Sequence, residues 1–247
     1  MRFNIVTLLL AGVTATSAAT TTSAASSAST CSPSSSDAKV LEFALGVSNF
    51  IGSFYNSTVN STFGESNNAT IKAYQKILFG LEKGNTLSSV AIEKVGAKAS
   101  GFSKPKCDYK FPEVNSTQTW AQWAYRFEDT VTGAFIGLAG YTESPEVSFL
   151  MARLAAEHSA HSSLIGSRVN STYFAQNSTS LVAAYGPAQI LSTRNQTGSL
   201  GEYLGDCLTA PTSPCGQLRI GPLAATPSPS SGAASSSSLA TSASKKI

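Results

Sequence analysis

The feature that most constrains the fold is a segment, residues 38–55, that is apolar around most of a helical circumference. Its widest face consists of Leu41, Ala44, Leu45, Ser48, Gly52 and Tyr55, flanked by Val47, Ile51 and Phe54. A helix that is apolar on so many sides needs other elements packed around it. We therefore predict that residues 38–55 form a central helix, with Asp37 as its N-cap.

Four later segments also have helical periodicity: residues 69–82, 87–101, 117–141 and 145–169. The Gly84-Asn85 pair is a typical helix stop, so we predict two separate helices on either side of it. Pro145 suits the first turn of the last helix. Together with residues 38–55, the sequence therefore predicts five helices, enough to form a helical bundle.

The connections between these helices fit the same architecture. Pro105 and Pro112 bracket a segment that cannot continue a helix, and we interpret residues 104–112 as a crossover between two halves of the bundle. After Asn170 the helical period is lost, and the chain up to about Leu223 should wrap the bundle irregularly. The predicted fold is an all-α four-helix bundle with one accessory helix and an irregular C-terminal wrap.

The two ends of the chain differ in composition from the middle. Residues 1–19 have a lone basic residue, an apolar run too short to span a bilayer and a small-residue exit, which predicts a secretory signal peptide. Residues 20–36 and 224–247 are rich in Ser, Thr and Ala and predict disordered segments around a helical domain at 37–223. The C-terminal segment lacks the apolar stretch of a lipid-anchor signal. We expect a secreted protein, extracellular or in the cell wall.

Potential glycosylation sites agree with secretion. There are seven Asn-x-Ser/Thr sequons, which begin at Asn56, Asn60, Asn68, Asn115, Asn170, Asn177 and Asn195. They fall in or beside predicted loops, where a bulky glycan would project into solvent. We therefore predict a glycoprotein.

The four cysteines, Cys31, Cys107, Cys207 and Cys215, have no metal-site spacing and predict disulfides in an oxidising compartment. Four cysteines allow three pairings, and the sequence does not choose among them. We prefer Cys107 with Cys207 or Cys215, because either bond would tie the segment after the bundle to the crossover.

Charge and motifs exclude several function classes. A net charge of +3 with 13% charged residues provides no dense basic patch, which argues against a nucleic-acid partner. The chain has no Gly-x-Ser-x-Gly, His-Glu-x-x-His or phosphate-loop motif. Nothing in these patterns indicates an enzyme, and we expect extracellular or cell-wall partners.

Three short motifs lie along the predicted helices and the crossover: Val40-Leu41-Glu42-Phe43-Ala44-Leu45 with Phe54-Tyr55, Cys107-Asp108-Tyr109-Lys110-Phe111-Pro112, and Phe127-Glu128 with Gly133-Ala134-Phe135-Ile136-Gly137. Together they resemble the secreted ferritin-like proteins of fungi, which are related to desiccation-related proteins and include stress-response and sexual-development proteins. The resemblance covers roughly residues 40–169. It implies a ferritin-like bundle.

A working di-metal centre in such a bundle takes a Glu from one helix of each pair and a Glu-x-x-His from the other. The chain departs from this pattern on its first helix, where both acidic positions of the family's Leu-Glu-x-Leu-Glu are lost in residues 47–51, and Glu42 lies on the polar side. Glu93 could fill the acidic position of the next ligand helix, but Gly96 stands where the His should be. Glu93 could equally be an exposed carboxylate with a local partner.

The remaining candidate ligands are Glu128, Glu157, His158 and His161. Glu128 lies at the edge of an apolar stripe, as a ligand or as a structural acid bonded to Tyr, Arg or backbone. In one register Glu157 keeps the acidic position; in the other His158 replaces it, and helical geometry favours both histidines as the inward residues. Two inward histidines one turn apart can bind a metal, or can be core histidines bonded to Glu128.

Three functions follow. The first is a secreted, glycosylated ferritin-like protein with a degenerate metal site and no cofactor, acting as a stress-related or cell-surface structural or interaction protein. The second is a metal-binding protein or oxidoreductase with a reduced site for iron or manganese. The third is a carrier of apolar ligands, with space beside Gly46, Gly52, Gly96 and Ala97.

Overall fold

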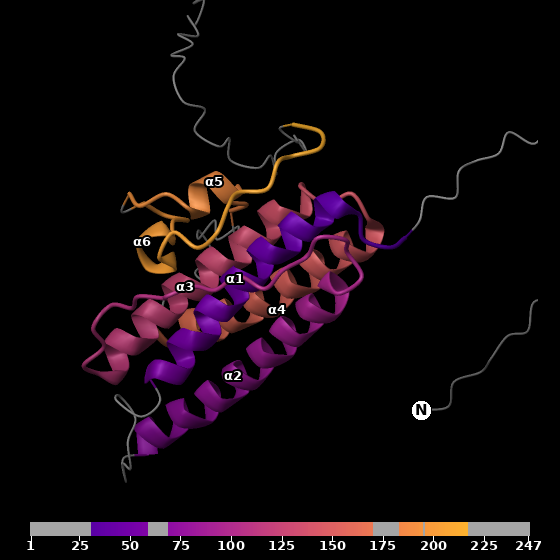
Figure 1. The fold of residues 1–247 in the computed structure, drawn as a ribbon. Coiled ribbons are helices and arrows are strands. Elements are labelled where there is room, and N and C mark those ends of the chain that lie inside the picture. Colours follow the sequence, from indigo (N-terminus) through magenta and orange to yellow (C-terminus); the bar gives the residue numbers. More distant parts are fainter. Residues whose placement is uncertain (1–30, 59–68, 170–182, 195, 217–247) are drawn as a thin grey trace, which may run out of the picture.

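The computed structural model describes residues 31–58, 69–169, 183–194 and 196–216, and within these ranges it contains helices and no strand (Figure 1). The long helices are α1 (Ser35–Thr58), α2 (Ala69–Gly96), α3 (Thr117–Ala139) and α4 (Pro145–Val169), followed by the short helices α5 (Pro187–Ile190) and α6 (Gly201–Leu204). The all-α prediction is confirmed. No helix in the described ranges combines the length and the apolar character that crossing a bilayer requires.

The long helices form a four-helix bundle made of two pairs. α1 packs mainly against α2 and α3 mainly against α4, while contacts of α1 with α3 and of α2 with α4 close the bundle. The predicted crossover, here residues 97–116, runs back along the bundle, so that α3 starts at the end where α2 starts (Figure 1). Both pairs are therefore antiparallel, and one long connection joins them.

α1 has the central place that its apolar girth predicts. Phe50 on α1 is fully buried, and its ring contacts the rings of Tyr109 and Phe111 in the crossover, Phe127 on α3 and Tyr203 on α6. The crossover and the C-terminal segment thus cover the sides of α1 that other long helices leave open. This is why a helix that is apolar on nearly every side is stable here.

The predicted helix break at Gly84-Asn85 is wrong, because α2 continues through both residues. The Asn85 side chain is only 2% exposed and donates from Nδ2 to the Ser48 carbonyl of α1 at 3.2 Å. Gly84 faces α4, where an added Cβ would lie 2.6 Å from a carboxylate oxygen of Glu157. Both residues serve contacts between helices, and the helices predicted at 69–82 and 87–101 are one helix, α2.

The start of α1 also differs from the prediction. Ser34 and Asp37 form a capping box, in which Asp37 N–H donates to Ser34 Oγ at 3.1 Å and Ser34 N–H donates to Asp37 Oδ2 at 2.9 Å. Asp37 therefore lies in the first turn instead of at the N-cap, and the helix begins inside the segment predicted as a linker. The buried Asp37 also accepts from the backbone N–H groups of Glu143 and Ser144, which ties α1 to the turn between α3 and α4.

The C-terminal segment wraps the bundle, as predicted, through close backbone contacts with α3. Tyr185 N–H donates to the Gly133 carbonyl at 2.9 Å. A Cβ at Gly137 would lie 2.0 Å from the Tyr185 carbonyl oxygen. Glycines one turn apart on α3 thus let a second backbone lie directly on the helix.

The space expected beside small residues is filled by side chains. An added Cβ would meet Leu208 at Gly46 and Phe102 at Gly96, each nearer than 3.0 Å. At Gly52 it would meet Asn85 at 2.7 Å. These glycines are positions of close packing, so they do not provide the cavity that an apolar-ligand carrier needs.

Among the predicted sequons, Asn56 and Asn115 are exposed, and their glycosylation stays a prediction. The other five asparagines lie outside the described residues: Asn60, Asn68, Asn170, Asn177 and Asn195. The predicted signal peptide at 1–19 and the tail at 224–247 also lie outside them, as does the 20–36 segment up to residue 30.

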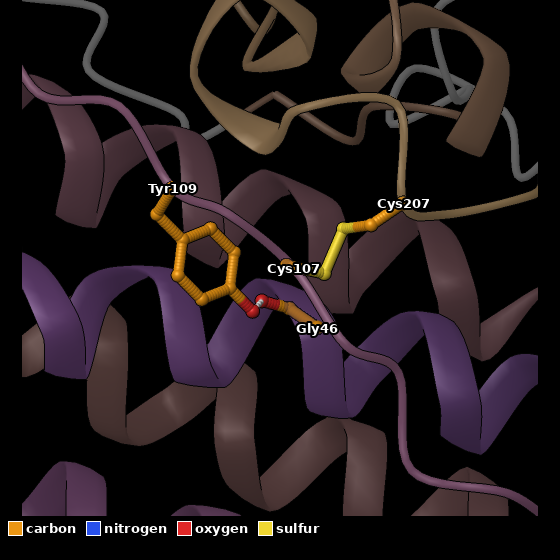
Figure 2. The surroundings of a disulfide bond; sticks show 4 residues. All are labelled: Gly46, Cys107, Tyr109 and Cys207. Carbon is orange, nitrogen blue, oxygen red and sulfur yellow. Dashed lines mark hydrogen bonds between the residues drawn. A yellow bond between two sulfur atoms is a disulfide. The ribbon is translucent and has the colours of Figure 1, made fainter.

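A disulfide joins Cys107 in the crossover to Cys207 after α6, which is one of the two pairings that we preferred (Figure 2). Beside it, the Tyr109 hydroxyl donates to the Gly46 carbonyl of α1 at 2.8 Å. Cys31 and Cys215 are free and exposed. The disulfide therefore fixes the C-terminal segment to the crossover, and Tyr109 fixes the crossover to α1.

Replacing both Cys107 and Cys207 by Ala should lower the free energy of unfolding by about 2–5 kcal/mol, because the bond closes a long loop in the unfolded chain. Denaturant unfolding followed by circular dichroism measures the change. The matched control replaces Cys31 and Cys215 by Ala and should leave the midpoint nearly unchanged. Equal stability of the two double variants would contradict the expectation.

Candidate metal centre

Three candidate ligands meet at the middle of the bundle. Glu128 on α3 and His158 and His161 on α4 each offer one ligand atom, and these atoms all lie within 4.8 Å of one another. The side chains of Glu128 and His158 are fully buried, and that of His161 is 15% exposed. The two histidines point the same way because they are three residues apart on one helix.

The Glu128 carboxylate is held by a neighbour at each oxygen. His158 Nδ1 lies 2.6 Å from Oε2, and the Tyr55 hydroxyl of α1 donates to Oε1. His161 Nδ1 lies 3.3 Å from Oε1 but outside the direction of a hydrogen bond. One buried acid therefore connects α1, α3 and α4.

The histidines determine the charge of this group. Burial opposes ionisation of Glu128, but the charge and hydrogen bond of His158, and then the nearby His161, outweigh it and lower the pKa of Glu128 to about 2. Burial and the adjacent Glu128 charge raise the pKa of Tyr55 well above its ordinary value. Burial lowers the pKa of His161, but the Glu128 charge outweighs this effect and the net shift is upward. At neutral pH Glu128 is an anion and Tyr55 a neutral donor.

Three buried polar atoms in this region have no hydrogen-bond partner among the described residues: His158 Nε2, His161 Nδ1 and Ser162 Oγ. Such atoms are rare in folded proteins. His161 Nδ1 is the important one, because it faces the carboxylate and keeps its lone pair or proton free. His161 Nδ1 therefore has no hydrogen bond that would compete with binding of a metal ion.

The donor set suits one metal ion and does not suit two. Two imidazoles and one carboxylate form a three-donor set that transition-metal ions accept. Two divalent ions would need several carboxylates for charge balance. Within the described residues, however, α1 places the Tyr55 hydroxyl against Glu128, and α2 places Gly84 near His161. A di-metal centre therefore does not fit these residues.

The predicted ligands Glu93 and Glu157 do not belong to this group of three, and neither does Glu42 on the polar side of α1. Glu93 forms an ion pair with Lys104 at 2.7 Å, the local pairing that we considered as its alternative role. Glu157 accepts a hydrogen bond from Ser88 of α2 at 3.1 Å and lies at the margin, where its charge contributes to the raised pKa of His161. Glu42 is engaged by Lys39 and by Ser103 of the crossover.

The sequence pattern alone does not reveal the roles of Tyr55 and Gly84. Tyr55 was counted with the apolar face of α1, although a buried Tyr hydroxyl usually needs a partner, and that need was the available signal. Gly84 was interpreted as a helix stop, but an added Cβ there would lie 3.3 Å from the His161 ring. A side chain at position 84 would crowd the Glu157 carboxylate first and then the His161 ring.

Comparison with known proteins agrees with this architecture. A family model described as ferritin-like domain matches residues 36–171, which is more than half of the chain. The chain therefore belongs to the ferritin-like domain family, as the resemblance implied. No curated protein and no solved structure matches it.

Replacing Tyr55 by Phe should lower the free energy of unfolding by about 1–3 kcal/mol, because a buried anion loses a hydrogen-bond donor while the ring stays in place. Chemical denaturation in the presence of a chelator measures the change. Tyr141→Phe is the control, since the Tyr141 hydroxyl bonds to no described residue. The interpretation fails if both variants unfold at the same denaturant concentration.

The pKa of Glu128 also predicts acid sensitivity. Folding lowers this pKa from an ordinary value of 4.5 to about 2, so the stabilisation is complete above the ordinary value and is lost as pH falls toward 2. The free energy of unfolding of the metal-free protein should therefore decrease across that window. Glu128→Gln, which cannot titrate, should show a shallower decrease, and an identical slope would count against the role of Glu128.

Proposed function

We propose that this protein is a secreted, glycosylated ferritin-like protein whose bundle centre has lost di-metal chemistry and acts as a polar structural core. Its role would be structural or in interactions at the cell surface, including under stress. The observation that supports this is the Glu128 carboxylate, whose oxygens are held by Tyr55 and His158. A carboxylate held in this way is already stabilised without an ion.

The bundle core supports the same proposal. Where a di-metal protein needs acids on the first helix, Ser48 is buried and hydrogen bonds to Ser89 at 2.9 Å and to Asn85 at 3.4 Å. These neutral contacts join α1 to α2 without an ion. Secretion and glycosylation rest on the predicted leader and on sequons such as the exposed Asn56 and Asn115.

A second candidate function is binding of a single transition-metal ion, for example iron or manganese. It is favoured by His161 Nδ1, which faces Glu128 without a hydrogen bond. Glu128, His158 and His161 would hold the ion. The ion would supply Lewis-acid or redox chemistry when bound.

Metal analysis of the full chain, loaded with Fe(II) or Mn(II) and then dialysed, distinguishes the two candidates. A structural core predicts less than stoichiometric metal and no oxidation of Fe(II) above background. A single site predicts one ion per chain, which His161→Ala loses and Glu93→Ala keeps because Glu93 pairs with Lys104 outside the group. Two ions per chain would contradict both candidates.

A further inference from the structure

A polar groove lies on the opposite pair of helices from Glu128 and the histidines. It has a volume of about 570 Å³, runs between α1 and α2, and is bordered by residues 105–107 and Tyr109 of the crossover. Glu128, His158 and His161 do not line it.

The groove is lined mainly by neutral amides and hydroxyls. They are Asn49, Ser53 and Asn56 on α1, and Asn85, Thr86 and Ser89 on α2. On α1 the three residues are spaced four and three apart, and on α2 Ser89 lies four residues after Asn85 and three after Thr86, so the two sets form facing stripes. Asn, Ser and Thr are less favourable inside helices than Ala, Leu or Glu, so their concentration on these two faces calls for a reason other than helix formation.

The inner side chains of the groove are hydrogen bonded to other described residues, and the outer side chains are not. Asn85 is fixed by Ser48, and Ser89 Oγ donates to Asn49 Oδ1 at 3.0 Å. The side chains of Ser53 and Asn56 hydrogen bond to no described residue. A preformed floor thus supports an outer row that offers both donors and acceptors.

The charges of the groove favour a neutral ligand. Glu93 is neutralised by Lys104, and the remaining charged groups, Glu82 and Lys106, have opposite signs. Tyr109 adds an apolar surface, because its hydroxyl is already bound to the Gly46 carbonyl and its ring is what remains available. Donors, acceptors and an aromatic ring without net charge match a molecule with many hydroxyls and apolar C–H faces.

We infer that the groove between α1 and α2 binds a carbohydrate. Two sources have this chemistry: a free oligosaccharide, and the protein's own glycan if Asn56, which lines the groove, carries one. The inference does not depend on whether the bundle centre holds a metal ion.

The test is isothermal titration of the full-length glycosylated protein with chitohexaose, laminarihexaose and mannohexaose. Four variants are compared with the glycosylated protein of natural sequence, which is called the unmodified chain because it has no substitution. Asn56→Gln removes the sequon and keeps an amide, while Ser53→Tyr and Thr86→Tyr fill the groove from α1 and α2. Ser167→Tyr is the matched control on the exposed end of α4. Circular dichroism verifies that each variant is folded. If one of Ser53→Tyr and Thr86→Tyr fails to fold, the other alone provides the test.

A free ligand predicts that the unmodified chain binds at least one of these sugars. Binding should then weaken at least about tenfold in a groove variant and stay unchanged in Ser167→Tyr. Occupation by the protein's own glycan predicts that the unmodified chain binds none, that Asn56→Gln binds, and that adding a groove substitution to Asn56→Gln abolishes binding. The inference is overturned if neither the unmodified chain nor Asn56→Gln binds, or if filling the groove changes nothing.

Discussion

The charge of one buried carboxylate is the constraint around which the bundle is arranged. Glu128 is removed from water, where an unpaired anion would be very unfavourable, so other helices must bring donors to it. α1 brings the Tyr55 hydroxyl and α4 brings His158. The relative rotation and height of three helices are therefore set by one acid, because each donor reaches it from only one position along its helix.

α2 contributes to the same arrangement through space and through neutral hydrogen bonds. Gly84 leaves room for Glu157 and His161 on α4, and Asn85 binds the Ser48 carbonyl on α1. A larger residue at 84 would have to displace the Glu157 side chain, and loss of the amide at 85 would leave a buried carbonyl without its second partner. The pair that resembles a helix stop thus positions α2 against both neighbouring helices.

Local pattern predicted most of the fold because helix length, period and caps are local properties. α4 has the predicted bounds, and α1 and α3 differ from the predictions by a few residues at their ends. The α2 prediction failed because contacts with other helices outweigh the propensity of Gly84 and Asn85. Similarly, the sequence indicates Glu128 and the histidines as candidates because they are polar residues on apolar stripes. The partners of Tyr55 and Glu93 cannot be predicted in this way, because they depend on which segments meet in space.

The disulfide has a consequence for biosynthesis. Its two cysteines are separated by 100 residues, and the second one follows all four long helices in the chain. Synthesis begins at the N-terminus, so every long helix has been made before the bond can close. The two sulfur atoms meet only when the crossover and the C-terminal segment lie on the same side of α1. Oxidation can therefore take place only in a chain in which all four long helices have been synthesised and the crossover and the C-terminal segment have come together.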